Sequence, residues 1–298
     1  MNNDSKITAV NKVQEYIQDH LKTHMSLSEV ANHAGYSPWH ISKIFKEFTG
    51  KTIFEYIRLL RLTQAALDLR DSEALVIDVA LEFIFDTHEG FTRAFAKEFG
   101  ITPKKYSLQT PPIKLFLPYP AIDLDRIKKG AKSMNSETTV VFTQVIERPR
   151  RKAIIKRGIK ADEYFSYCEE VGCEIWGELC SIKGALYEPM GMWLPEKLIA
   201  KGTSEYVQGV EVPYDFNGII PDGYDLITLE ECKMMIFQGP KYEEEDFQEE
   251  IAKVMEAIKE YDPTPFGFEW ADDSAPSFQY APQGSRGYIE GRPVKMII

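Results

Sequence analysis

Two sets of polar and basic residues lie at helical spacing, and their side chains could bind DNA. The first set follows Pro38 and the second precedes Gly100, so each falls on one face of a short helix whose apolar residues take the other. Lysine binds phosphate, and an arginine can bind both acceptors of a guanine edge in the major groove. We predict that Lys46 contacts phosphate and that Arg93 contacts guanine. The predicted DNA-contacting residues are Trp39, His40, Ser42, Lys43, Lys46, His88, Glu89, Thr92, Arg93 and Lys97.

The segments that position these residues repeat one another. Residues 31–56 align with residues 80–106 through apolar, glycine and aromatic positions, with a period of about fifty residues. Each copy predicts a short helix, a tight turn and a second helix that ends at a glycine. Further helices are predicted over about residues 6–24 and 53–69, where apolar residues recur at mixed spacings of three and four.

Local capping signals set the boundaries of the first copy. Ser26 and Glu29 form a capping box that begins a helix at Leu27. Gly35 can adopt the positive φ that the turn needs. Ser37 is a good N-cap for the second helix, which the sequence therefore predicts to be a separate element.

This tandem pattern resembles the two helix-turn-helix units of the AraC/XylS family of transcription regulators. The resemblance covers residues 6–108 and is carried by residues 31–40 and 91–103. It implies an all-α domain that reads two DNA half-sites about one helical turn (~34 Å) apart. One position departs from the family, which usually has glycine in the second turn where this chain has Ile84. A β-branched residue at positive φ is strained, so either this turn is reshaped or the second unit is less stable than the first.

Charge is distributed unevenly along the 298 residues. The net charge is −11, yet residues 1–135 hold 18 lysines and arginines against 16 acidic residues, and residues 136–298 hold 17 against 30. The N-terminal half is only slightly basic, so we expect DNA binding of modest affinity and modest salt dependence. No stretch approaches the ~18 apolar residues of a membrane helix, and no signal-peptide pattern is present. These features predict a cytoplasmic protein without a membrane partner.

A linker with several prolines, predicted over residues 109–137, precedes a second duplicated region. Residues 152–158 match residues 233–239 at an offset of 81. Each copy is followed by an acidic helix, near residues 162–182 and 243–261, and then by two strand-like runs. The period of the apolar residues changes here, which indicates that strands begin after the linker.

The C-terminal region is predicted to be an α+β domain of two β-α-β-β repeats over residues 138–298. It resembles the GyrI-like effector-binding domain through residues 190–195, 206–212 and 267–270. The resemblance implies a pocket for a lipophilic, frequently cationic molecule, with aromatic walls and one buried carboxylate that matches Glu269. Aromatic rings and a desolvated carboxylate both favour a cation. The implied ligand-binding residues are Glu269, Trp176, Trp193, Tyr206, Tyr164 and Glu211, with Glu178 as a further carboxylate.

Simpler structural roles compete with these assignments. Glu269 could be a surface residue of an edge strand, and the aromatic residues could belong to an ordinary core. The four cysteines make no Cys-x-x-Cys pair, and the first three, Cys168, Cys173 and Cys180, are predicted to be helix-face or core thiols and not metal ligands. The acidic run at residues 243–246 is better explained as a helix N-terminus than as a metal site.

The sequence therefore predicts a ligand-responsive transcription regulator, not an enzyme, that uses no cofactor and no metal. Its expected partners are double-stranded promoter DNA, a small organic effector and RNA polymerase. Two alternatives stay open. In one, the C-terminal domain is a hydrolase in which Glu269 and Tyr206 activate water. In the other, it sequesters drugs or a partner protein, and Ile84 weakens DNA binding.

Overall fold

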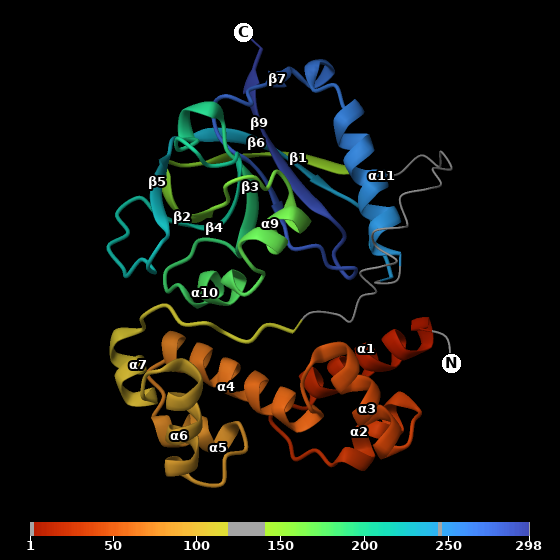
Figure 1. The fold of residues 1–298 in the computed structure, drawn as a ribbon. Coiled ribbons are helices and arrows are strands. Elements are labelled where there is room, and N and C mark those ends of the chain that lie inside the picture. The colour runs from red at the N-terminus through yellow and green to blue at the C-terminus, as the bar shows by residue number, and fades with distance from the viewer. Residues whose placement is uncertain (1–2, 119–140, 244–245, 298) are drawn as a thin grey trace. The chain divides into compact units, whose positions relative to one another are not determined.

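The computed structural model describes residues 3–118, 141–243 and 246–297. The chain forms two compact units, Met1–Lys129 and Gly130–Ile298. The first unit is helical and the second is built on a sheet (Figure 1). Most of the predicted linker, residues 119–137, lies outside the described residues.

The helical unit consists of two helix-turn-helix pairs joined by a long helix, as the sequence predicts (Figure 1). The first pair is α2–α3, the second is α5–α6, and α4 connects them. The helices are α1 (Asn3–Asp19), α2 (Leu27–Ala34), α3 (Pro38–Thr49), α4 (Ile53–Asp71), α5 (Val76–Glu82), α6 (His88–Phe99) and α7 (Pro103–Gln109).

The predicted capping signals of the first pair are confirmed. Ser26 Oγ accepts a hydrogen bond from the Glu29 N–H at 3.2 Å, and the Glu29 carboxylate accepts one from the Ser26 N–H at 2.7 Å. Gly35 ends α2 with a φ of 77°. Ser37 then caps α3 by accepting a hydrogen bond from the His40 N–H at 3.4 Å. These local bonds satisfy donors that a helix start leaves unpaired.

The second turn has the same conformation as the first, although its residue is not glycine. Ile84 takes the place of Gly35 and adopts a φ of 59°. The Ile84 N–H donates to the Leu81 carbonyl at 3.1 Å. The Phe85 N–H donates to the Ala80 carbonyl at 2.9 Å. The turn is therefore not reshaped, and the left-handed conformation costs an L-residue such as Ile84 roughly 1–2 kcal/mol.

A tyrosine on α4 organises the core around the first pair. Tyr56 is fully buried, and its hydroxyl accepts a hydrogen bond from Gln14 Nε2 at 3.0 Å. Its ring packs edge-on against Phe45 and Phe116, each with centroids 5.1 Å away. The Phe116 N–H also donates to Thr63 Oγ1 at 2.9 Å. The apolar start of the predicted linker therefore packs on the helical unit.

Within residues 141–243 and 246–297, the second unit forms one antiparallel sheet of nine strands with helices packed on it (Figure 1). Its strand order is β1-β6-β9-β8-β3-β4-β2-β5, and β7 pairs with β9. The strands are β1 (Phe142–Arg148), β2 (Arg151–Arg157), β3 (Met190–Trp193), β4 (Tyr206–Pro213), β5 (Asp225–Leu229), β6 (Cys232–Gln238), β7 (Phe268–Trp270), β8 (Ser277–Tyr280) and β9 (Ile289–Met296). The α-helices are α9 (Tyr164–Glu170), α10 (Ile175–Ser181) and α11 (Phe247–Glu260), and short 3-10 helices span Glu196–Leu198 and Thr264–Phe266.

Two details of this unit differ from the sequence-based prediction. The helix expected over residues 162–182 is divided into α9 and α10, because Gly172 lies between them with a φ of 103°. The strands β1, β5 and β8 were not predicted. The first two are largely exposed at the two ends of the sheet, so they lack the apolar alternation that marks a half-buried strand.

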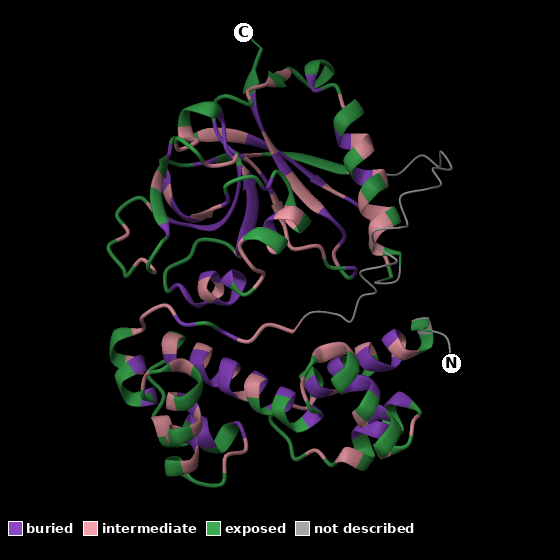
Figure 2. Cartoon of the chain, viewed as in Figure 1, coloured by how far each residue is buried: buried purple, intermediate pink, exposed green. Residues whose placement is uncertain are grey.

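Alternation along β6 separates two apolar cores, one on each face of the sheet. Met234 and Ile236 belong to a cluster that includes side chains of β2, β3 and β4. Met235 and Phe237 face the other way and pack against Val254 of α11. Figure 2 shows the resulting burial, with buried residues concentrated along the central strands.

Candidate functional site

The α3 helix presents an aromatic and basic face to solvent. Trp39 is 75% exposed, and Lys43 Nζ lies 5.8 Å from the centroid of its ring. Lys46, about one turn further along, is exposed as well. Ile41 and Phe45 are fully buried on the opposite side. The first helix-turn-helix pair therefore points its second helix outward, which is how such a helix enters the major groove.

Two other predicted contacts on α3 differ in availability. His40 is exposed, and its ring lies edge-on to Tyr36 at 5.7 Å. Ser42 is half-buried, and its hydroxyl donates to the Pro38 carbonyl at 2.7 Å. The Ser42 proton is thus already used within the helix, whereas His40 can reach an external partner.

The α6 helix carries a face of mixed charge. His88, Glu89, Arg93 and Lys97 are all exposed. Arg93 Nε donates to the Glu89 carbonyl at 3.4 Å, a long bond that leaves the terminal nitrogens of the guanidinium able to bind elsewhere. The α3 face has two lysines and a tryptophan, so the two outward faces are chemically different.

Thr92 differs from the prediction made for it. Its Oγ1 atom is buried and has no hydrogen-bond partner within the described part of the chain. Phe91 and Phe95 beside it are fully buried, and the helical period places Thr92 at the edge of their apolar face. The structure does not present this hydroxyl to DNA, contrary to the expectation from sequence.

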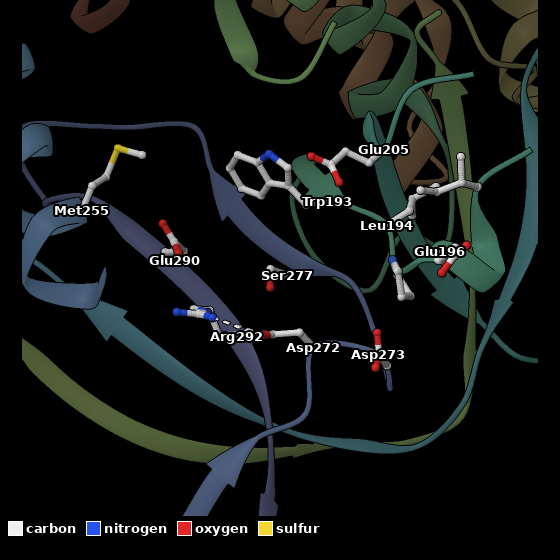
Figure 3. A pocket seen from close by; sticks show the side chains of 12 residues that line it. Trp193, Leu194, Glu196, Glu205, Met255, Asp272, Asp273, Ser277, Glu290 and Arg292 are labelled. Atoms are coloured by element: carbon white, nitrogen blue, oxygen red, sulfur yellow. Dashed lines mark hydrogen bonds and ion pairs between the residues drawn. The ribbon is translucent and has the colours of Figure 1, made fainter. Parts of the chain in front are cut away.

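A cavity of about 450 Å³ lies on the sheet unit (Figure 3). Its walls come from β3, β8, β9, α11 and the loops beside them. Five carboxylates and a single guanidinium line it. The lining residues are Trp193, Leu194, Pro195, Glu196, Ile199, Glu205, Met255, Asp272, Asp273, Ser277, Glu290 and Arg292.

Glu290 on β9 is the carboxylate in this cavity that burial affects most clearly. Burial raises its pKa, although a hydrogen bond from Tyr288 and the charge of Arg292 both act to lower it. The Tyr288 hydroxyl lies 2.8 Å from Glu290 Oε2 and 3.0 Å from Gln279 Oε1. A tyrosine hydroxyl has one proton and can donate to only one of them. When Tyr288 donates to Glu290, the hydrogen bond stabilises the carboxylate form and opposes the effect of burial on its pKa.

The other cavity walls combine an aromatic ring with partly neutralised charge. Trp193 Nε1 donates to the Asp162 carbonyl at 3.0 Å, and its ring packs edge-on against Tyr206 at 5.2 Å. Arg292 forms an ion pair with Asp272 at 3.2 Å. The remaining carboxylates of the lining give the cavity a negative potential.

The structure brings only one of the predicted ligand-binding residues to the cavity. Trp193 lines it, and Tyr206 is fully buried directly behind that ring. Trp176 is buried on α10 and Tyr164 is half-buried on α9. The cavity, as described, does not include them. Glu178 accepts a hydrogen bond from the Tyr224 hydroxyl at 2.7 Å instead.

The prediction that Glu269 is a buried carboxylate is wrong. Its side chain is 54% exposed and pairs with Lys295 at 3.0 Å. It lies on β7, a short strand that pairs only with β9 among the described strands. Tyr206 lies on β4, and β8 and β3 separate that strand from β9. The Glu269–Tyr206 pair required by the hydrolase alternative is therefore not formed.

Glu211 is also misplaced by the prediction. It is buried between two arginines, 2.6 Å from Arg148 Nη1 and 2.8 Å from Arg151 Nε. Along β4, Glu211 lies on the same face of the sheet as Val207. That face is opposite to the one that carries the cavity. The charge of Glu211 stabilises buried arginines and does not reach the cavity.

Sequence reasoning missed Glu290. The signal was the alternation of Tyr288, Glu290 and Arg292 within a run already read as a strand. The corresponding run contains Tyr206 and Gln208, also two residues apart. Comparing the two runs position by position would have identified Glu290 as an inward polar residue.

The described residues were also compared with the requirements of a metal site and of a membrane-spanning helix. Within residues 3–118, 141–243 and 246–297, no group of three or more histidine, cysteine or carboxylate side chains is placed to hold a metal ion. Residues 244–245 of the acidic run lie outside that set, and Asp246 precedes α11 directly. Over the same ranges, none of the helices has the length and hydropathy needed to cross a bilayer.

The helix-turn-helix segment is similar to known proteins. A family model described as a helix-turn-helix domain matches residues 30–109. The chain is 44% identical over 91 residues to the right origin-binding protein of Escherichia coli (strain K12), a match that covers 30% of this chain and 32% of that protein. It is 39% identical over 99 residues to the transposon Tn10 TetD protein of Escherichia coli, which covers 33% of this chain and 72% of that protein.

Among solved structures, a transcriptional regulator with an AraC-type DNA-binding domain from Chromobacterium violaceum aligns with a TM-score of 0.34 and 20% identity, over 36% of this chain and 96% of that one. The chain spans about a third of the length of the right origin-binding protein. The family match ends at residue 109, so it concerns the helical unit.

Proposed function

This chain belongs to the AraC family of transcriptional regulators, and from that premise we propose that one chain contacts two adjacent major-groove segments of promoter DNA. In this proposal α3 supplies Trp39, Lys43 and Lys46, and α6 supplies Arg93 and Lys97. The observation that carries the proposal is that these five side chains are exposed on the second helix of each pair.

The two helices recognise different sequences, so the proposed site has no two-fold symmetry. The α3 face has an indole and two ammonium groups, which suit a thymine methyl group and phosphates. The α6 face has a guanidinium, which suits a guanine edge. Two half-sites about one helical turn (~34 Å) apart would then be read by a single chain.

Substitutions on each helix test this arrangement. A DNA site is first selected from random sequence with the full chain, and affinity is measured by mobility-shift titration. Arg93→Ala costs about 1–3 kcal/mol and relaxes the preference at one base, whereas Lys46→Ala weakens all sequences alike and lowers the salt slope by about one. Lys259→Ala, exposed on α11, is the matched control for loss of one charge. Full affinity and unchanged base preference of Arg93→Ala would contradict the assignment.

We further propose that the sheet unit is a GyrI-like effector-binding domain built from two β-α-β-β repeats. Read outward from its centre, the strand order is β3, β4, β2, β5 on one side and β8, β9, β6, β1 on the other. Along the chain, β2 precedes α9 and α10 in the first half, and β6 precedes α11 in the second. This correspondence of position and order supports the repeat.

The chemistry of the cavity supports an effector that is cationic and partly apolar. Glu290 takes the role that the sequence assigned to Glu269, because it is a half-buried carboxylate inside a cavity. Trp193 offers a ring face for a cation–π contact, and Met255 offers apolar surface. Arg292 is occupied by Asp272, so the excess negative charge remains for the ligand.

A lipophilic aromatic cation tests the pocket. Tetraphenylphosphonium binding to the full chain is measured by calorimetry, with triphenylphosphine oxide as the neutral analogue. Glu290→Gln weakens binding of the cation about tenfold, which corresponds to ~1.4 kcal/mol, and leaves the neutral analogue unaffected. Glu269→Gln, on the exposed strand β7, is the matched control and leaves both unchanged. Equal cation affinity of the Glu290→Gln variant and the unaltered chain would contradict the proposal.

A further inference from the structure

The loop between α1 and α2 is held against the long helix α4. It spans residues 20–26 and leads directly into α2 of the first helix-turn-helix pair. Arg61, in the middle of α4, donates hydrogen bonds to two backbone carbonyls of this loop. Its Nε donates to Leu21 at 2.9 Å and its Nη2 to Thr23 at 2.6 Å. Hydrogen bonds from an ionised donor are stronger than those between neutral groups, so Arg61 fixes the loop on α4.

Lys22 extends the same loop to the second helix-turn-helix pair. Its ammonium forms an ion pair with Glu82, the last residue of α5, at 2.5 Å. The same ammonium lies 5.2 Å from the centroid of the Phe83 ring, which is buried where α5 ends. The carboxylate of Asp68 on α4 attracts it as well. The loop that begins the first pair therefore contacts the second pair beside the turn that contains Ile84.

Without these contacts, α4 would be the support that the two pairs share. Tyr56 and Leu60 of α4 belong to the core of the first pair, and α4 also contacts α5 and α7. A helix of 19 residues can curve along its length, so the helices packed at its two ends can shift relative to one another. We refer to Lys22, Arg61 and Glu82 as the brace. It opposes such a shift because it ties one loop to α4 and α5 at once.

We propose that the brace fixes the separation of α3 and α6 and so sets the spacing of DNA half-sites that the chain accepts. This inference rests on the proposed reading of two half-sites by one chain. One added base pair moves the second half-site by about 3.4 Å along the duplex and turns it by about 35°. The two pairs can follow that movement only by shifting relative to one another, which breaks the brace. The residues of the brace are positioning residues, because they act through α3 and α6.

DNA of altered spacing tests the proposal. The full chain is titrated by mobility shift against its selected site and against the same site with one base pair added between the half-sites. The spacing ratio is the Kd for the longer site divided by the Kd for the selected site. Lys22→Glu should lower this ratio about threefold, since an exposed ion pair is lost. Arg61→Ala should lower it about tenfold, since two charged hydrogen bonds are lost.

The spacing ratio is insensitive to two general effects of these substitutions. It compares two DNAs bound by the same variant, so a uniform change in phosphate attraction cancels. A fraction of unfolded protein raises both Kd values by the same factor and cancels too. A role confined to the stability of the domain would therefore leave the ratio unchanged, whereas a role in positioning lowers it.

An exchange of charges and a second ion pair provide the controls. Lys22→Glu combined with Glu82→Lys restores an ion pair of the opposite sense and should recover most of the spacing ratio. Lys6 and Glu47 form an ion pair at 3.1 Å that joins α1 to α3 within the first pair. Lys6→Glu should therefore leave the ratio unchanged. Failure of the exchange to recover the ratio, or an equal fall in Lys6→Glu, would overturn the proposal.

The outcomes also separate the brace from the proposed function. A spacing ratio that Lys22→Glu and Arg61→Ala both leave unchanged refutes the brace alone, provided that binding still depends on Lys43 and Arg93. A selected site with a single recognition segment, or binding that ignores both Lys43→Ala and Arg93→Ala, refutes reading by two helices and the brace with it.

Discussion

Substitutions to alanine or glycine at residues 35 and 84 test whether both helix-turn-helix turns require a residue with a left-handed backbone conformation. The Gly35 N–H donates to Asn32 at 3.1 Å, and the Ile84 N–H donates to Leu81 at 3.1 Å, so the bonding of the two turns is the same. A Cβ atom built on Gly35 meets no atom within 4 Å. Gly35→Ala therefore introduces no clash and reports the cost of the backbone conformation alone.

The magnitude follows from two opposing effects. An L-residue in the left-handed region costs roughly 1–2 kcal/mol, and alanine recovers about 0.5–1 kcal/mol because glycine loses more entropy on folding. Gly35→Ala should thus lower the free energy of unfolding by about 0.5–1 kcal/mol. At residue 84 the informative difference is between Ile84→Gly and Ile84→Ala, because both lose the half-buried isoleucine side chain. Glycine should be the more stable by the same amount.

Urea denaturation of the full chain, followed by helical circular dichroism, measures these differences. Lys12, exposed within α1, is the matched control, because alanine there should be more stable than glycine by about 1 kcal/mol. The sign of the preference must therefore invert between residue 12 and residues 35 and 84. Alanine proving more stable than glycine at residue 84 would refute a left-handed Ile84.

Three further predictions concern buried polar groups. Glu211→Gln should lower the free energy of unfolding by about 3–5 kcal/mol, because Arg148 and Arg151 lose their buried counter-charge; a change no larger than that of the exposed Glu269→Gln in urea denaturation would contradict this. Tyr56→Phe should cost about 1 kcal/mol by leaving Gln14 without its buried acceptor, and an unchanged melting temperature would argue against that bond. Burial raises the pKa of Glu290, so the folded chain binds this proton more tightly than the unfolded chain, and the stability it contributes is lost as pH rises through the folded pKa. The Glu290→Gln variant should accordingly have a higher melting temperature than the unaltered chain near pH 8. The two should not differ in this way near pH 4, where a free glutamate is already about half protonated. The same difference in melting temperature at both pH values would show that the pKa of the carboxyl is not perturbed.

The helical unit could be predicted in detail because its signals are local. Ser26 and Glu29 cap α2 through bonds spanning three residues, and Gly35 and Ser37 lie in the turn itself. Such bonds need no knowledge of distant segments. The conformation of Ile84 could not be predicted, since the sequence shows only a conflict between the residue and its position. The hydrogen bonds of the turn decide that conflict in favour of the left-handed backbone.

The cavity could not be predicted because burial in a sheet depends on which strand lies alongside. Glu269 lies between Phe268 and Trp270, and Glu290 follows Tyr288 by two residues, so both carboxylates have aromatic residues nearby in the sequence. Glu269 is exposed because β7 pairs only with β9 among the described strands, whereas Glu290 is covered because β9 lies between β6 and β8. Likewise β1 pairs with β6, which begins more than eighty residues after β1 ends. No local pattern records that pairing.

Hydroxyl-radical footprinting tests the central claim most directly. The full chain is bound to its selected DNA site, and cleavage protection is compared for the unaltered chain, Lys43→Ala and Arg93→Ala. Two protected segments about one helical turn (~34 Å) apart are expected for a single bound chain. Lys43→Ala should lose one segment and Arg93→Ala the other. Loss of the same segment in both variants, or of neither, would contradict the view that α3 and α6 each read DNA.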